Sequence, residues 1–297
     1  MKLIHGDSHV ELKKLKSESV DAIIIDPPYR YFKKEKKFRL DKSFNREKIF
    51  NELYRILKNN SFICIFGRGV ELCKDVVYLQ QLGFFFFLEE IVWYKNRNSN
   101  MFGELLRFHE LCYILVKGNR KLNKVKLDYF ETIESEERLD KLKADYNRIK
   151  HSLNNANIND LKKYLEIGVV NYNKIYNSNH KIISDLKKTG EAGINTAKKI
   201  KEGTMIRSVI KCNIEQNKYK VPTQKPVELL KRLILLTTKE GDLILDCFMG
   251  SASCGKAALD LNRDFIGIEI DDEYFGIAKE NIKEKQEELK EKLDLKD

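Results

Sequence analysis

The residues with the clearest chemical potential are Asp26, Pro27, Pro28 and Tyr29, which follow an apolar run at 22–25. A proline fixes its own φ, has no N–H, and biases the residue before it towards extended backbone. We therefore expect the Asp26 carboxylate and the Pro27 carbonyl to be two fixed acceptors. They match the two donors of an exocyclic NH2 group on a nucleobase, and Tyr29 offers a ring for stacking. A plain strand exit capped by prolines is the alternative.

A second candidate is the small-residue turn in LILDCFMGSASCGKAALDLNRDFIGIEID, residues 243–271. A strand ending at Asp246 enters this turn, the turn opens a helix, and the next strand ends at Glu269. In nucleotide-type sites small residues let the backbone approach the ligand, and an acid on the next strand accepts hydrogen bonds from ribose hydroxyls. A tight connection without a ligand is the alternative. The sequence has no GxxxxGK[ST] run, so a phosphate-binding NTPase loop is not indicated.

Apolar periodicity predicts the elements that must position these residues. Strands are expected at 2–5, 20–25, 61–66, 84–94, 111–116, 243–246 and 265–270, and helices at 45–57, 70–82, 226–238, 256–261 and from about 272. The β-branched run at 20–25 is typical of a strand buried on both faces of a parallel sheet. Strands that alternate with helices indicate a three-layer α/β fold with a mainly parallel sheet.

The pattern changes between residues 118 and 218, which are rich in Lys, Asn, Glu and Ile and show helical stretches near 134–151 and 158–190. We interpret this segment as a mostly helical insert. The expected domain then consists of residues 1–117 and 219–297.

The chain carries a formal net charge of +10, and the surplus is uneven. Residues 30–48 hold nine Lys and Arg against three Asp and Glu, and residues 118–218 hold 21 against 13. Two such segments fit a surface that follows nucleic-acid phosphates, or two solvated lysine-rich faces.

Other classes of protein receive no support. The six cysteines are scattered without a CxxC pair, so we expect no metal site and no disulfide framework, and reduced cysteines of a cytoplasmic protein are the simplest account. We find no signal peptide, and the apolar runs are too short to cross a membrane.

Taken together, these stretches resemble the permuted beta group of DNA amino-methyltransferases that use S-adenosylmethionine. That group has its catalytic tetrapeptide first, its target-recognition region in the centre and its cofactor turn last, as here. Further similar stretches are HGDSHVELKKLKSESVDAIIIDPPY (5–29), IVWYKN (91–96), FHELCYILVKG (108–118) and PTQKPVELLKRLI (222–234). The resemblance covers roughly 1–118 and 219–285 and implies a circularly permuted, Rossmann-like methyltransferase sheet.

The resemblance also implies roles for single residues. The tetrapeptide from Asp26 would be catalytic, and the cofactor would be held by Asp7 near the adenine, Thr223 and Lys225 at the methionine carboxylate, Asp246, Phe248, Gly250 and Ser251 along the turn, and Glu269 at the ribose. The chain departs from the family where Cys247 replaces a proline and Ala252 a glycine. The methyl group at 252 would weaken cofactor binding if that backbone needs a positive φ. Glu110 and its neighbour His109 match a family pair that we expect to be mainly structural.

The implied reaction is methyl transfer from S-adenosylmethionine to the N6 amino group of adenine in DNA, with the base flipped into the pocket. Asp26 at the head of the tetrapeptide, rather than Ser, favours adenine N6. Cytosine-N4 methylation, RNA adenine methylation and a catalytically decayed DNA-binding protein stay open as alternatives. The insert is expected to supply phosphate contacts and base readout, and the family likeness suggests a homodimer and a restriction-modification role.

Overall fold

The computed structural model describes residues 1–28, 45–95, 108–127, 143–149, 195–213 and 224–294. Contacts divide the chain into two compact units. One unit consists of Met1–Asn123 with Arg207–Asp297, and the other consists of Lys124–Ile206. Every described residue that the sequence predicts for the site belongs to the first unit.

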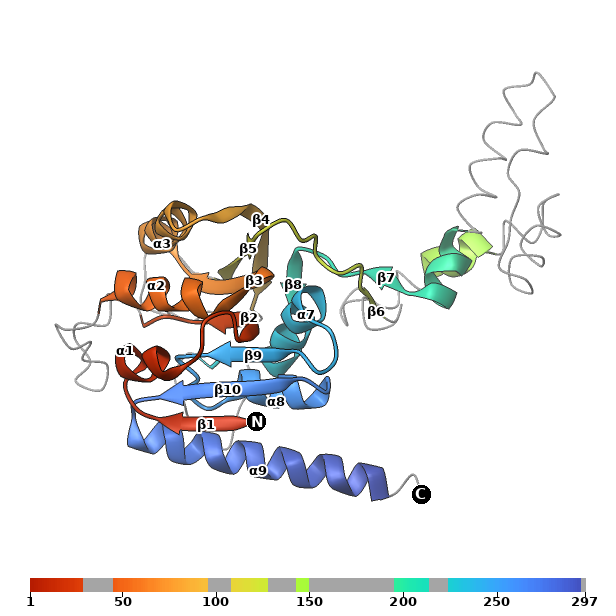
Figure 1. Cartoon of the computed structure of the whole chain (residues 1–297). Coiled ribbons are helices and arrows are strands. Elements are labelled where there is room, and N and C mark those ends of the chain that lie inside the picture. Colours follow the sequence, from red (N-terminus) through yellow and green to blue (C-terminus); the bar gives the residue numbers. More distant parts are fainter. Residues whose placement is uncertain (29–44, 96–107, 128–142, 150–194, 214–223, 295–297) are drawn as a thin grey trace. The chain divides into compact units, whose positions relative to one another are not determined.

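The first unit is built on an eight-stranded mixed sheet (Figure 1). In spatial order the strands are β1 (Lys2–His5), β10 (Asp264–Glu269), β9 (Leu243–Asp246), β2 (Val20–Ile25), β3 (Leu57–Gly67), β5 (His109–Lys117), β4 (Phe84–Tyr94) and β8 (Val209–Lys211). Pairing is antiparallel only on the two sides of β5 among the described strands of this sheet. The predicted α/β fold with a mainly parallel sheet is confirmed.

Helices cover both faces of the sheet (Figure 1). One layer holds α1 (Ser8–Glu11), the 3-10 turn η1 (Leu12–Lys14), α2 (Arg46–Ile56) and α3 (Gly69–Gln81), and the other holds α7 (Val227–Thr237), α8 (Ser253–Asp260) and α9 (Asp272–Asp294). Ile23 and Ile25 of β2 pack with α2 in the core of the first layer. Ala22 and Ile24 are equally buried and lie outside that cluster, as strand alternation requires. Burial on both faces explains why β2 is almost wholly apolar.

Local signals in the sequence set the helix ends near the site. The Asn45 side chain accepts a hydrogen bond from the Lys48 N–H at 3.0 Å and caps α2. Pro226, with φ −59°, directly precedes α7. Gly83, with φ 101°, follows the end of α3 in the left-handed conformation that glycine adopts freely.

The second unit is described only in part. Residues 143–149 and 195–202 are helical, and β6 (Lys126–Leu127) pairs antiparallel with β7 (Thr204–Met205). The predicted helix 158–190 lies outside the described residues, as does most of the predicted helix 134–151.

The observed unit boundary differs from the predicted one. The insert was expected at 118–218, whereas the second unit spans Lys124–Ile206, and β8 joins the main sheet through β4. A strand of three residues is too short to show a period in the sequence. Among the described helices, none has the length and apolar content needed to span a membrane.

Candidate active site

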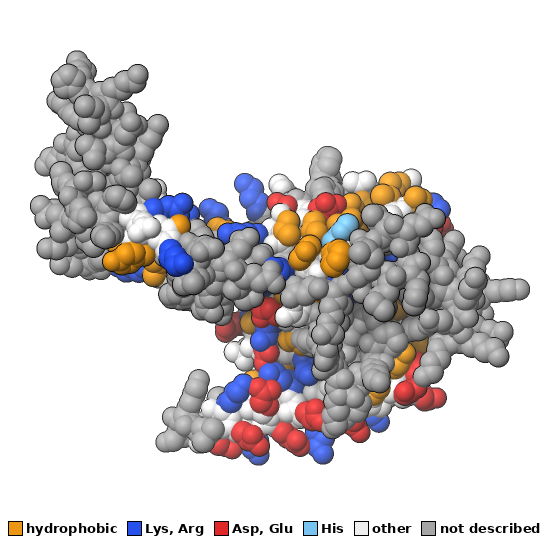
Figure 2. All heavy atoms as spheres, turned by 180° about the vertical axis from the view of Figure 1, so that it is seen from behind, with side chains coloured by type: hydrophobic (Ala, Val, Ile, Leu, Met, Phe, Trp, Pro, Cys, Tyr) orange, Lys and Arg blue, Asp and Glu red, His pale blue; other side chains and the backbone are white. Residues whose placement is uncertain are grey.

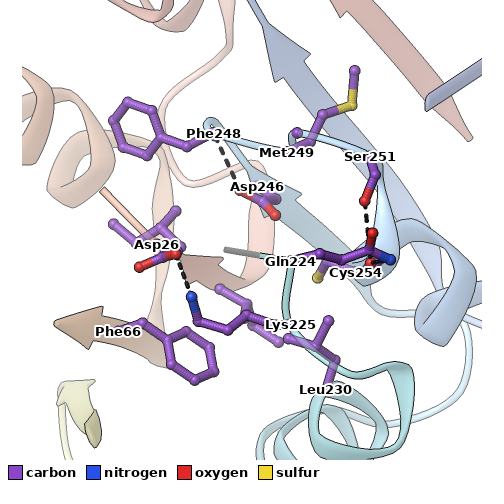
Figure 3. Close-up of a pocket in the computed structure, with 14 residues that line it drawn as sticks. Asp26, Phe66, Gln224, Lys225, Leu230, Asp246, Phe248, Met249, Ser251 and Cys254 are labelled. Atoms are coloured by element: carbon purple, nitrogen blue, oxygen red, sulfur yellow. Dashed lines mark hydrogen bonds and ion pairs between the residues drawn. The ribbon is translucent and has the colours of Figure 1, made fainter. Parts of the chain in front are cut away.

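The carboxyl ends of the parallel strands β2, β3 and β9 meet at an open cleft (Figure 3). Open α/β sheets bind their ligands at this end of their strands. The cleft is lined by Ile24, Ile25, Asp26, Phe66, Gln224, Lys225, Leu230, Asp246, Phe248, Met249, Gly250, Ser251, Ser253 and Cys254. Residues far apart in the sequence therefore share one cavity.

Asp26 lines the cleft from the end of β2 and forms an ion pair with the buried ammonium of Lys225 (Figure 3). The same ammonium lies 3.4 Å from Glu110 Oε2 and 5.2 Å from the centre of the Phe66 ring. Burial lowers the pKa of Lys225, but the two carboxylates outweigh burial and raise it. Lys225 therefore stays protonated, and the ion pair leaves the cleft beside Asp26 open.

Glu110, which was expected to be mainly structural, lies within this charge cluster. Its Oε1 pairs with the ammonium of Lys95, whose side chain is 5% exposed and lies 4.6 Å from the centre of the Trp93 ring. Burial raises the pKa of Glu110, but the ammonium groups of Lys225 and Lys95 outweigh burial and lower it. The result is a chain of alternating charges in the order Asp26, Lys225, Glu110, Lys95. The sequence held one signal for the Glu110–Lys95 pair: Lys95 directly follows the predicted strand 84–94, and Glu110 directly precedes the predicted strand 111–116.

Asp246 forms another wall of the cleft and is itself buried. Burial raises its pKa to about 7, the hydrogen bond from the Phe248 N–H opposes this rise, and the carboxylate of Asp26 adds to it. The Phe248 N–H lies 3.0 Å from Asp246 Oδ1. A buried acid with a raised pKa is stabilised in its charged form by a cationic ligand. Asp246 therefore suits a ligand with a positive centre.

The turn after β9 has the left-handed backbone of a close-approach loop. Gly250 has φ 52°, and a Cβ added there would meet no atom within 4 Å. Ala252 has φ 61°, ψ 33°. Ala252 thus has the positive φ at which its methyl group is expected to weaken cofactor binding. For a non-glycine residue it costs about 1–2 kcal/mol.

Glu269, at the end of β10, is tied to this turn. Its Oε2 accepts a hydrogen bond from the Gly250 N–H at 2.8 Å, and its Oε1 accepts from the N–H groups of Ile270 and Asp271 at 2.9 Å each. Burial raises the pKa of Glu269, and these hydrogen bonds oppose the rise. Glu269 does not line the cleft but positions the turn that does.

The remaining predicted residues fall into two groups. Asp7 accepts a hydrogen bond from the His9 N–H at 2.9 Å, caps α1 and does not line the cleft. Pro27 and Pro28 follow Asp26 as expected, whereas Tyr29 and Thr223 lie outside the described residues. Prediction also missed three residues: Glu110 and Lys95, together with Gln224, which lines the cleft and donates a hydrogen bond to Ser253 Oγ at 2.7 Å.

The residues present fit S-adenosylmethionine, a cofactor with a sulfonium cation, a carboxylate and an adenosine. The buried acid Asp246 would stabilise the sulfonium, and Lys225, which is protonated and already paired with Asp26 and Glu110, is the cation that the cleft lining offers to the carboxylate. The small residues of the turn, Gly250 and Ser251, leave the backbone accessible.

Comparison with known proteins agrees with this geometry. Residues 20–280 match the N6/N4 methyltransferase family, described as DNA methylase. The chain is 28% identical to the type II methyltransferase M2.DpnII of Streptococcus pneumoniae over 97% of its own length and 91% of that protein. It is 29% identical to the DNA adenine methyltransferase YhdJ of Escherichia coli K12, over 92% and 79% of the two chains.

Solved structures show the same fold. The crystal structure of an M1.HpyAVI complex with S-adenosylmethionine matches with a TM-score of 0.55 at 23% identity, and the match covers 94% of this chain and 97% of that one. The predicted Rossmann-like methyltransferase fold is thus confirmed. Since the family match spans most of the sequence, the chain belongs to the DNA methylase family.

Proposed function

We propose that this protein transfers a methyl group from S-adenosylmethionine to the exocyclic N6 of adenine in DNA. Family membership confirms the predicted class of enzyme, a DNA methyltransferase. The observation that carries the finer proposal is that Asp26 and Asp246 face one cleft from the ends of the neighbouring strands β2 and β9. Asp26, which is paired with Lys225, would accept hydrogen bonds from a neutral amine, and Asp246 would stabilise a cation, as methyl transfer from a sulfonium requires.

Each group of the site has a distinct part in the proposed reaction. S-adenosylmethionine, when bound, supplies a methyl group made electrophilic by its sulfonium. Asp246 and the turn at Phe248 to Ser251 would hold the methionine and sulfonium region, and Lys225 with Thr223 would hold the carboxylate. The Asp26 carboxylate and the Pro27 carbonyl would accept the two hydrogens of the amine. Both acceptors favour a pyramidal nitrogen whose lone pair points at the methyl group, and Asp26 can take the proton that the amine gives up.

The target base must leave the duplex to reach this cleft, so base flipping is part of the proposal. Tyr29 would stack on the flipped base. Glu269 and Asp7, which do not line the cleft, would contact the adenosine where the cofactor extends beyond it. DNA contacts are assigned to the basic segments 30–48 and 118–218. The C-terminal helix α9 is a poor candidate for DNA contact, since acidic and basic side chains are intermixed along it (Figure 2).

Product analysis tests the proposal. The purified protein is incubated with S-adenosylmethionine and either unmethylated DNA or RNA, and the digested nucleosides are identified by mass spectrometry. We expect N6-methyldeoxyadenosine from DNA. N4-methyldeoxycytidine would support the cytosine alternative, which the family name also covers. N6-methyladenosine from RNA alone would support the RNA alternative.

The departures at Cys247 and Ala252 motivate a second candidate function, a DNA-binding protein without catalysis. Calorimetry with S-adenosylmethionine separates the two, because a decayed site would give no binding heat. We also propose that the protein is a cytoplasmic homodimer and that its motifs have the permuted order, as the resemblance to the methyltransferase group implies. Sedimentation of the purified protein tests the dimer.

A further inference from the structure

We propose that Arg46 is a positioning residue that sets the acceptor geometry of the catalytic tetrapeptide through the carbonyl of Pro28. The inference rests on the proposed function, in which Asp26 and the Pro27 carbonyl hold the target amine. Arg46 lies outside the cleft and belongs to none of the stretches that resemble the family's motifs.

Arg46 joins three elements through its guanidinium group. It is the first residue of α2 and its side chain is 8% exposed. One terminal nitrogen donates to Asp75 Oδ2 of α3 at 2.6 Å, and the other donates to the carbonyl oxygen of Pro28 at 3.0 Å. Glu71, one turn earlier on α3, lies 3.9 Å from the same guanidinium. Pro28, which follows β2, is thus tied to α2 and α3.

Covalent geometry carries this constraint to the acceptor. The Pro28 ring fixes its φ, and the hydrogen bond from Arg46 fixes the direction of its carbonyl and hence its ψ. The peptide group between Pro27 and Pro28 is planar, so the Pro27 carbonyl moves with the Pro28 ring as one rigid piece. With both dihedrals of Pro28 set, the Pro27 oxygen keeps one orientation relative to Arg46 and the helices that hold it, while β2 holds Asp26.

Stability alone does not explain a buried guanidinium at this position. A buried ion pair is often no more stabilising than apolar side chains of similar volume, because both charges lose their hydration. The Nε of Arg46 is also buried and has no hydrogen-bond partner among the described residues, which is itself unfavourable. The planar, forked guanidinium of arginine instead lets two nitrogens donate to two acceptors on different elements, Asp75 and the Pro28 carbonyl.

Arg55 offers a matched control on the same helix. It also pairs with a carboxylate, Glu52, and donates to backbone carbonyls, those of Leu15 at 2.9 Å and Leu12 at 3.1 Å. Its contacts lie away from the tetrapeptide. Arg55→Gln therefore measures how much stability and rate are lost when an arginine that binds backbone carbonyls away from the site is removed.

The experiment compares Arg46→Lys and Arg46→Gln with Arg55→Gln and the unaltered protein. Lysine keeps the charge beside Asp75 but lacks the fork that reaches both acceptors, so we expect Arg46→Lys to fold and to lose the contact with Pro28. Arg46→Gln leaves the buried Asp75 without this cation, so we expect it to fold with lower stability. We expect their single-turnover methylation rate on saturating DNA to fall by about ten- to a hundredfold, as for a reacting group misplaced by about 1 Å. The affinity for S-adenosylmethionine should stay within about threefold, and Arg55→Gln should lose stability without losing rate.

A rate within about twofold of the unaltered protein in Arg46→Lys would overturn the inference while leaving the proposed function intact. Hydrogen exchange of the Tyr29 amide, the first backbone N–H after the two prolines, supplies a readout that needs no activity. We expect faster exchange there in both Arg46 variants and not in Arg55→Gln. Unchanged exchange would refute the positioning role even if the unaltered protein made no methylated base.

Discussion

At the scale of single residues, two aspartates in one cleft have opposite surroundings. Asp26 is paired with Lys225, which Glu110 also contacts. Asp246 has no ion pair among the described residues, and burial raises its pKa to about 7. The charge of Asp26 is thus balanced by Lys225, whereas the charged form of Asp246 would need a cationic ligand to stabilise it.

The raised pKa of Asp246 predicts a pH dependence of stability. The folded state holds the proton more tightly than the unfolded chain, so the contribution of Asp246 is fully present below its ordinary pKa and is lost as pH rises to about 7. In Asp246→Asn this loss is absent, and the amide oxygen still accepts from Phe248. We expect urea unfolding to show that the variant gains a few kcal/mol relative to the unaltered protein between pH 5 and pH 8.

Asp260→Asn is the control for that measurement. Burial raises the pKa of Asp260, but hydrogen bonds from Lys231 and Lys285 outweigh burial and lower it. Its stabilising contribution is therefore already complete at pH 5, and replacing it should cost a constant amount from pH 5 to pH 8. A parallel pH profile for the two variants would contradict the role assigned to burial at Asp246.

At the scale of elements, β10 supports the turn that follows β9, the proposed cofactor-binding turn. The Met249 N–H donates to the carbonyl of Ile268 at 3.1 Å. A Cβ on Gly267 would come within 2.3 Å of the Met249 sulfur and 2.7 Å of the Phe265 ring. Glycine at 267 therefore lets the turn pack directly on the strand.

Gly267→Ala should disturb both stability and cofactor binding. The added methyl group must push aside Met249, which lines the cleft, and overpacking of this kind costs about 1–3 kcal/mol. We expect a lower urea midpoint and weaker binding of S-adenosylmethionine by calorimetry. Gly276→Ala in α9 is the control, since a Cβ there meets no atom within 4 Å and should add about 0.4–1 kcal/mol of stability. Equal behaviour of the two variants would contradict the packing argument.

The sequence predicted the elements well where a local cause sets them. Asn45 caps α2, Pro226 precedes α7, and the apolar run at 20–25 is a strand buried on both faces. It predicted less where the cause is a distant partner. The edge strand β8 exists through its pairing with β4, and its three residues carry no period of their own.

The same distinction holds for the site. The ends of β2 and β9 were predictable, because each strand is apolar and stops at an acid. Glu110 was indicated only by the opposite charges that flank two strands, since its role depends on Lys225, 115 positions away, and on Lys95, which directly follows the neighbouring strand β4. Arg46 likewise appeared as one of many basic residues, and only the folded chain brings it to Pro28.

At the scale of the whole molecule, β2 joins the two sequence halves of the first unit. It pairs with β3 on one side and β9 on the other, and Asp26 meets Lys225 although 199 positions separate them. The site therefore forms only when both halves fold together. Among the described residues, none of the second unit, Lys124–Ile206, lines the cleft.

In the proposed reaction the Asp26 carboxylate accepts a hydrogen bond from the amino group of the target adenine. This role is tested by the single-turnover methylation rate of Asp26→Ala on saturating DNA, measured beside the Kd for S-adenosylmethionine. We expect a rate at least about a hundredfold lower, the loss expected when one preorganised hydrogen-bonding group is removed, with the Kd changed less than about threefold. A rate near that of the unaltered protein, at unchanged Kd, would contradict it.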